Sequence, residues 1–374
     1  MSMIRSACAA VCDKIMKTTI VGGGNIGTQF AVHCAEKKHE VTVYTSTPGI
    51  YQKHLNTVDE DGNTSHEGDI AGATDNPEVA FRNADFIMVT LPSTMMRTAA
   101  DLIYDHTDSH PIIGVVPGNG GSECAFRKCI ERGNTFFGLE RVPAIARLVK
   151  KGATVKSTGY RDELHVASIP ASKSEMCCEL IQGIFDMHTK SIPNFLNLTM
   201  TPSNPILHTT RLRTLFKDYK PGVVYINMPL FYEEWDDASS ELLIACDEEV
   251  QEICRALPEY QLEYVKSLRA HYESPTVEAM TKKISSIAAF KGLTTPTVEV
   301  EGGVIPDLHS RYFTADFSYG LTILKQVADL AGVSTPNIVA TMQWYKDIAI
   351  EHNEFRFEDF GITDMKSFEE FYLR

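Results

Sequence analysis

A glycine-rich turn near the start of the chain has the residue types and spacing to bind a dinucleotide. The turn Gly22-x-Gly24-Asn25-Ile26-Gly27 follows a short apolar run and precedes a stretch with helical periodicity. Glycines at this spacing allow a tight turn, bring a pyrophosphate close to backbone N–H groups, and let the helix pack on the strand. The sequence therefore predicts a dinucleotide-binding turn; a purely structural glycine loop is the alternative.

The choice of dinucleotide depends on the end of the second predicted strand. An acidic residue normally meets the ribose of NAD there, but this chain has Tyr44-Thr45-Ser46-Thr47. The hydroxyls of Thr45 and Ser46 can bond a 2′-phosphate, and no carboxylate repels it. No arginine follows directly, and the nearest basic residues are Lys53 and His54. A simple capped turn is the alternative. The residues favour NADP slightly over NAD.

Two later turns are expected to border the same cofactor. Leu91-Pro92 and Pro117-Gly118 each follow an apolar run, 86–91 and 112–116, that is typical of a parallel strand covered on both faces. The carboxyl ends of such strands line the ligand crevice of an open α/β sheet. Ordinary structural turns are the alternative.

Two segments of the second half place polar residues suited to acid–base chemistry in apolar company. His208 closes Asn204-Pro205-Ile206-Leu207-His208, and Arg311 precedes Asp316 by five residues. Histidine titrates near neutral pH, a carboxylate fixes its tautomer, and a guanidinium grips a substrate carboxylate. From the residues alone, a core histidine, a helix-capping aspartate and a surface arginine are the favoured readings.

Together with the glycine turn, these segments resemble the opine dehydrogenases, the octopine/nopaline family that includes N-(1-carboxyethyl)amino-acid dehydrogenases. The resemblance runs over nearly the whole chain from Thr18. Its motifs are Gly22-x-Gly24-Asn25-x-Gly27, Pro117-Gly118 with Gly120-Gly121 and Phe126-Arg127, Asn204-Pro205-x-x-His208, Tyr272-Glu273-Ser274-Pro275, and Arg311-Tyr312-Phe313 with Asp316 and Gly320-Leu321.

This resemblance implies an NAD(P)-dependent oxidoreductase that acts on CH–NH bonds. Such an enzyme condenses the amine of an amino acid with a 2-oxo acid and reduces the imine. By position, His208 is the implied general acid/base, Asp316 its partner, and Arg311 the group that holds a substrate carboxylate. Asn204 and Arg147 are also expected at the substrate.

The length of 374 residues favours two domains. We expect an α/β fold in which a Rossmann-type dinucleotide-binding domain, 17–193, precedes a mainly α-helical substrate domain, 194–374, like the C-terminal domain of 6-phosphogluconate dehydrogenase. Residues 1–16 are expected to be a disordered extension. The helices predicted in the second half are 233–256, 261–271, 276–290, 319–331, 337–351 and 365–372.

Composition narrows the partners. The formal net charge of −14 argues against nucleic acid or an anionic membrane surface as a partner. The chain has no run of about 18 apolar residues, so no membrane-spanning helix is predicted. Nine cysteines without regular spacing predict reduced thiols in a cytoplasmic protein, with no metal site. Small-molecule substrates are therefore expected, and a homodimer is left open. A ketone or 2-oxo acid reductase of the ketopantoate reductase type, and a dinucleotide sensor without turnover, are the alternative functions.

Overall fold

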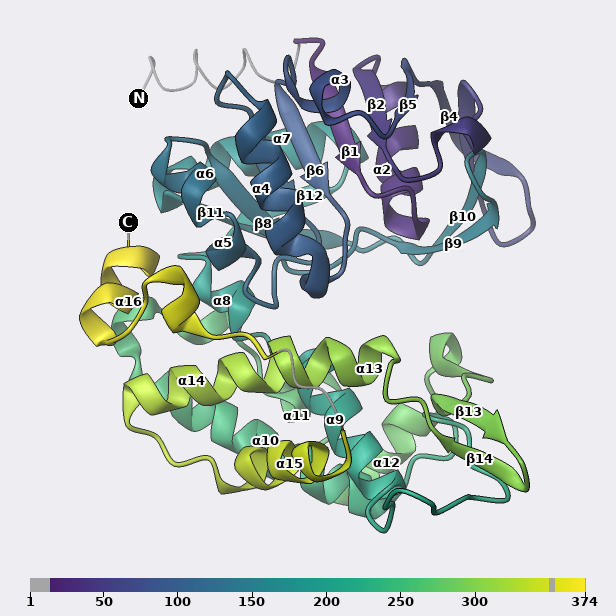
Figure 1. The fold of residues 1–374 in the computed structure, drawn as a ribbon, viewed down its shortest axis with the longest axis vertical. Helices are drawn as coiled ribbons and strands as arrows, with labels where there is room; N and C mark the ends of the chain where they lie inside the picture. The colour runs from purple at the N-terminus through teal and green to yellow at the C-terminus, as the bar shows by residue number, and fades with distance from the viewer. Residues whose placement is uncertain (1–13, 350–353, 374) are drawn as a thin grey trace. The chain divides into compact units, whose positions relative to one another are not determined.

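The computed structural model describes residues 14–349 and 354–373, and these form two units (Figure 1). Unit 1 contains residues 14–198 and 370–373, and unit 2 contains residues 199–349 and 354–369. The division after Leu198 lies a few residues beyond the junction expected from the sequence. Most of the expected extension, residues 1–13, lies outside the described part of the chain.

Unit 1 is built on an eight-stranded sheet with the order β12-β11-β8-β7-β6-β1-β2-β5. The six strands β8, β7, β6, β1, β2 and β5 pair in parallel. Strand β11 is antiparallel to β8, and β12 is parallel to β11. The strands are β1 (Lys17–Val21), β2 (Glu40–Tyr44), β5 (Gly72–Thr74), β6 (Phe86–Val89), β7 (Ile112–Val115), β8 (Phe136–Leu139), β11 (Glu163–Ile169) and β12 (His188–Ser191). The predicted Rossmann-type sheet is confirmed.

The register of the central strands brings the expected ligand loops to one edge. Val21 at the end of β1 pairs with Val89 of β6, and Val89 pairs with Val115 of β7. Every residue of β6 is buried, as expected for a strand covered on both faces. The loops that follow these three strands therefore leave the sheet side by side.

A second sheet of unit 1, with the order β4-β3-β10-β9, was not predicted from the sequence. It comprises β3 (His54–Val58), β4 (Thr64–Asp69), β9 (Ile145–Lys150) and β10 (Thr154–Thr158). Helix α2 (Asn25–Glu36) contacts strands of both sheets. β4 is mostly exposed and polar, so it lacks the apolar pattern that predicts a strand. The other helices of this unit are α3 (Pro77–Phe81), α4 (Met96–His106), α5 (Ser122–Ala125), α6 (Arg127–Glu131) and α7 (Ser174–Phe185), and α8 (Leu196–Thr199) reaches the unit boundary.

Unit 2 is mainly helical, as predicted, and has one hairpin, β13 (Thr297–Val300) with β14 (Gly303–Pro306). Its helices are α9 (Ser203–Leu215), α10 (Asp237–Ala256), α11 (Leu268–His271), α12 (Val277–Ser285), α13 (Arg311–Thr314), α14 (Thr322–Ala331) and α15 (Pro336–Ile348), and α16 (Met365–Tyr372) ends the chain.

Three helix predictions in unit 2 were wrong in detail. The predicted helix 276–290 ends at Ser285, and a separate 3₁₀ turn follows at Ala288–Phe290. The predicted helix 261–271 is a short 3₁₀ turn, Leu262–Tyr264, followed by α11, because the Ser267 hydroxyl accepts a hydrogen bond from Ala270 N–H and starts a new helix. The predicted helix 319–331 begins earlier, as a π-helical turn over Asp316–Leu321 that continues into α14.

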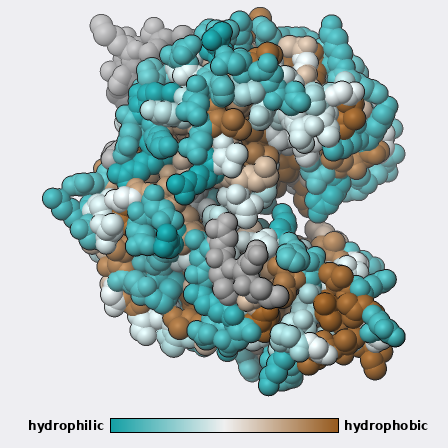
Figure 2. Space-filling view, in the orientation of Figure 1, coloured by the Kyte–Doolittle hydropathy of each residue, from teal (hydrophilic) through white to brown (hydrophobic). Residues whose placement is uncertain are grey.

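Three further observations concern the surface, the cysteines and the hydropathy of the helices. Figure 2 shows apolar surface at the β13–β14 hairpin, where Val298 and Val300 are exposed. The seven cysteines in the described part of the chain are free thiols, six of them buried. Among the described helices, none combines the length and hydropathy that a membrane span requires.

Candidate active site

His208 in unit 2 is held between a carboxylate and a phenol. Its Nδ1 lies 2.7 Å from Asp316 Oδ2, and its Nε2 lies 2.7 Å from the hydroxyl of Tyr232. The imidazole is buried, and the Tyr312 ring lies 4.4 Å from it, centroid to centroid. Because a carboxylate only accepts, Nδ1 carries a proton toward Asp316, and the neutral ring offers the Nε2 lone pair to the Tyr232 O–H.

Two elements that are far apart in sequence create this arrangement. His208 lies on α9, and Asp316 is the first residue of the π-helical turn. The turn packs against α9 at Gly320, where an added Cβ would lie 2.7 Å from Pro205 Cβ. The capping role considered for Asp316 is wrong, since Asp316 lies within continuous helical structure and faces His208. A π-helical turn commonly marks a functional site.

Tyr232 lies in the turn between α9 and α10, and sequence reasoning missed it. Its ring stacks on Phe290 with a centroid distance of 4.1 Å, and burial together with neighbouring Tyr312 raises the pKa of its hydroxyl. The hydroxyl therefore stays protonated and donates to His208. No local pattern singles out Tyr232; only the fold brings it to His208.

Arg211 positions the turn that carries Tyr232. It follows His208 by three residues on α9, and its side chain is fully buried. Its Nε donates to the carbonyl of Phe231 over 2.9 Å, and one terminal nitrogen lies 3.0 Å from Asp236 Oδ2. The other terminal nitrogen donates to the carbonyl of Glu234. Bonds on both sides of Tyr232 fix its backbone relative to His208.

The other expected residues of unit 2 are at the surface. Arg311 at the start of α13 is exposed, with its guanidinium 5.7 Å from the Tyr312 ring centre, and it has no carboxylate partner among the described residues. Asn204 is exposed in the first turn of α9. Tyr312 thus contacts both His208 and Arg311.

In unit 1 the glycine turn joins β1 to α2 as the sequence predicted. An added Cβ at Gly27 would lie 1.7 Å from the Gly22 carbonyl oxygen, so helix and strand approach closely only with glycine there. Gly24 is the N-cap of α2; no side chain caps this end, and the first turn has no acidic residue. Asn25 Oδ1 accepts from Leu148 N–H, and Ile26 is half-buried. Uncapped N–H groups at a helix N-terminus fit the pyrophosphate of a dinucleotide.

The end of β2 offers hydroxyls and no carboxylate. Thr45 Oγ1 lies 2.9 Å from the position of a Cβ on Gly23, so it lies beside the glycine turn, and Ser46 is exposed. The Thr47 hydroxyl is buried without a hydrogen-bond partner among the described residues. An unpaired buried hydroxyl just after β2 fits a site that a polar ligand completes.

The remaining expected cofactor residues follow β6 and β7. Leu91 is half-buried and Pro92 exposed, whereas Pro117 is half-buried and Gly118 buried against Gly138. Arg147, expected at the substrate, is exposed on β9. It precedes Leu148, whose N–H donates to Asn25 Oδ1.

Comparison with known families decides the relationship of the chain. Residues 191–349 match the model described as NAD/NADP octopine/nopaline dehydrogenase, alpha-helical domain. Residues 17–121 match the NAD-dependent glycerol-3-phosphate dehydrogenase N-terminus. The helical domain of the chain therefore belongs to the octopine/nopaline dehydrogenase family. The chain is an NAD(P)-dependent oxidoreductase.

Relatives from animals and bacteria carry opine names. Octopine dehydrogenase from Pecten maximus is 24% identical over 73% of this chain and 72% of its own length. Vitopine synthase from Allorhizobium ampelinum is 22% identical and covers 93% of both chains. The fold resembles octopine dehydrogenase solved with NADH and pyruvate, with a TM-score of 0.81, 22% identity, and coverage of 94% of this chain and 97% of that one.

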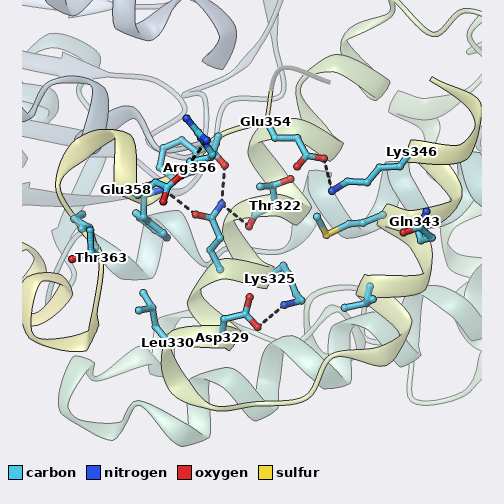
Figure 3. Close-up of a pocket in the computed structure, with 16 residues that line it drawn as sticks. Thr322, Lys325, Asp329, Leu330, Gln343, Lys346, Glu354, Arg356, Glu358 and Thr363 are labelled. Carbon is cyan, nitrogen blue, oxygen red and sulfur yellow. Dashed lines mark hydrogen bonds and ion pairs between the residues drawn. The ribbon is translucent and has the colours of Figure 1, made fainter. Parts of the chain in front are cut away.

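Unit 2 also has a cavity that is separate from the His208–Asp316 pair. It has a volume of about 540 Å³ and lies between α14, α15 and the segment 354–363 (Figure 3). Its charged side chains are paired within its own wall, Lys325 with Asp329 and Lys346 with Glu354. Neither His208 nor Asp316 lines it, so its volume says nothing about the size of the substrate.

Proposed function

We propose that this chain catalyses the reductive condensation of an amino acid with a 2-oxo acid, using NADPH or NADH, to give an N-(carboxyalkyl)amino acid. The observation that carries the proposal is the buried His208–Asp316 pair in the unit that matches the family model. Arginine and pyruvate, each present in a solved octopine dehydrogenase with NADH, are the first substrates to test.

The residues of unit 2 account for the proton transfers of this reaction. Forming an imine removes a proton from an amine and delivers one to a departing hydroxyl, and a single histidine performs both steps near neutral pH. Asp316 holds His208 in the tautomer that leaves Nε2 as the base, and it stabilises the imidazolium once the proton is taken. The bound dinucleotide supplies the hydride.

Exposed cations of the chain bind the substrate carboxylates in this proposal. Arg311 has a free planar guanidinium beside Tyr312, which itself touches His208, so a carboxylate on Arg311 lies close to the acid–base pair. Asn204 is one turn before His208 on α9 and supplies an amide to the same substrate. Arg147 is the corresponding cation on unit 1. These local charges attract anions despite the net charge of −14.

The assay is oxidation of NADPH or NADH by the purified chain over a panel of amino acids with pyruvate and other 2-oxo acids. Turnover that requires both an amine and a 2-oxo acid supports the proposal. Turnover with the 2-oxo acid alone identifies a reductase of the ketopantoate type instead. Dinucleotide binding without turnover on any pair identifies the sensor.

NADP is the cofactor that we propose as preferred. The end of β2 presents Thr45 and Ser46 in place of a carboxylate, so a 2′-phosphate meets hydroxyl donors and no repulsion. Thr45→Asp is expected to lower kcat/KM for NADPH at least about tenfold relative to NADH, since one repelled charge is worth about 1.4 kcal/mol or more. The measurement is the ratio of kcat/KM for the two dinucleotides. Thr45→Asn, equal in shape but uncharged, is the control, and an unchanged ratio in Thr45→Asp contradicts the assignment.

A further inference from the structure

Three side chains with metal-binding atoms meet at the far end of α2 in unit 1. His33 and Glu36 lie one turn apart on α2, and His66 comes from β4. One ligand atom from each lies within 4.8 Å of the others. The cluster begins nine residues after Gly24, about 13 Å along the helix, so it is separate from the dinucleotide turn. We propose that His33, Glu36 and His66 bind a divalent transition-metal ion, with zinc as the probe.

The donor set suits such an ion. Two imidazoles and one carboxylate are ligands that zinc and its neighbours prefer, whereas calcium and magnesium prefer oxygen alone. Zinc holds these ligands at about 2.0–2.2 Å, so two ligand atoms on one ion are at most about 4.4 Å apart. The present spacing of up to 4.8 Å closes with small side-chain rotations.

Burial decides which ligands rotate. The His33 side chain is almost completely buried, with ring centroids of Phe185 and His66 at 4.5 Å and 4.3 Å, so it is the fixed member. The side chains of Glu36 and His66 are 34% and 31% exposed to solvent. They therefore have room to rotate, and an ion can reach them from solvent.

Each of the three ligands already has a hydrogen-bond partner. Glu36 Oε2 lies 2.9 Å from His66 Nδ1, and the Tyr160 hydroxyl lies 3.0 Å from His33 Nε2. The Tyr160 hydroxyl is an outer partner of the kind that orients a metal ligand, whereas Glu36 and His66 are both ligands and can exchange their mutual bond for bonds to the ion. Lys37, which acts electrostatically on His33, is paired with Asp186, and this pairing reduces its repulsion of an incoming cation. The cluster therefore combines one carboxyl group and two imidazoles with a neighbouring lysine that is already paired.

The ion would act as a structural clamp. α2 contacts both sheets of unit 1, and its first residues form the dinucleotide turn. A bond from His33 and Glu36 to His66 ties the end of this helix to β4. An ion that binds the folded chain alone stabilises it in proportion to its concentration.

The test uses the full chain without a histidine tag, stripped with a chelator. We expect one zinc per chain after dialysis, measured by elemental analysis, and a higher Tm with zinc. Glu36→Gln keeps the size of the side chain and an oxygen for His66, and His66→Ala removes a partly exposed ring; each is expected to weaken zinc binding at least tenfold and to abolish the rise in Tm. His54→Ala is the matched control, because His54 is an exposed imidazole on β3 beside Glu67 and Asp69.

Several results would overturn the proposal. They are the absence of stoichiometric zinc, equal zinc affinity in Glu36→Gln and the parent, or loss of binding in His54→Ala. A cobalt-loaded chain with a thiolate charge-transfer band would assign the ion to cysteines instead. Circular dichroism and NADPH binding of the metal-free variants, expected to match the parent, separate a lost ligand from a misfolded chain.

Discussion

His208 illustrates how three ordinary side chains become a chemical unit. The imidazole has a hydrogen-bond partner on each nitrogen, Asp316 on one and Tyr232 on the other. Burial removes competing water, so each hydrogen bond is worth more than it would be at the surface. The substrate must therefore reach a base that is already oriented and already hydrogen-bonded.

Removing either end of the His208–Asp316 pair tests the acid–base assignment. His208→Ala is expected to lower kcat on the order of 10²–10⁴-fold, and Asp316→Asn to lower it substantially, since the neutral amide no longer fixes the tautomer or stabilises the imidazolium. Steady-state kinetics measure kcat, and NADPH fluorescence measures dinucleotide binding, which should persist because the glycine turn lies in unit 1. Full turnover by His208→Ala would refute the assignment.

Tyr232→Phe tests the role of the phenol at Nε2. The variant keeps the ring that stacks on Phe290 but loses the hydrogen bond to His208. We expect kcat to fall about tenfold, the equivalent of one hydrogen bond of about 1.4 kcal/mol, with KM for the dinucleotide unchanged. Tyr219→Phe, at another buried tyrosine of unit 2, is the control and should behave like the parent. If Tyr232→Phe and Tyr219→Phe had the same kcat, Tyr232 would contribute to packing alone and not to catalysis.

At the scale of elements, α9 organises unit 2. Its buried face carries His208 toward the π-helical turn and Arg211 toward the turn between α9 and α10. The glycine at position 320 lets the π-helical turn approach Pro205 on the same helix. One helix thus positions both partners of its own histidine.

Arg211→Lys tests this control of the turn. A lysine cannot reproduce the bonds of the guanidinium to Phe231, Glu234 and Asp236, so carbonyl oxygens near Tyr232 lose their donors. We expect a loss of about 2–4 kcal/mol in the free energy of unfolding, measured by urea denaturation, together with a lower kcat. Arg213→Lys, on the same helix but with one bond to Thr341, should lose less. Equal losses of stability in Arg211→Lys and Arg213→Lys would contradict this role of Arg211.

For the molecule as a whole, a buried carboxyl makes stability depend on pH. Asp247 on α10 is almost completely buried, and burial raises its pKa to about 7 even though Oδ2 accepts from Leu268 N–H. Because the folded-state pKa lies above that of an unfolded aspartate, the protonated form stabilises the fold at low pH. That stability, on the order of 3–4 kcal/mol, is lost as the pH rises from about 4 through about 7.

Asp247→Asn removes this titration while keeping an oxygen for Leu268 N–H. The difference in unfolding free energy between variant and parent should therefore shift in favour of the variant between pH 5 and pH 8. Urea denaturation at both pH values measures it, and groups common to both chains cancel in the difference. A difference that is constant with pH would show that Asp247 titrates normally.

Local spacing alone determined the glycine turn between strand and helix, the parallel strands after it and the helical second half, whereas His208 and Asp316 became a candidate pair only through the resemblance to the opine dehydrogenases. The turn, the strands and the helices follow from periodicity and from motifs within a few residues, which act through short-range sterics and burial. Tertiary structure alone decided that Tyr232 and Arg211 serve His208, that Asp316 lies in a π-helical turn, and that His33, Glu36 and His66 meet. The physical reason is that these contacts join residues tens to a hundred positions apart, where packing, and no local pattern, sets which side chains touch.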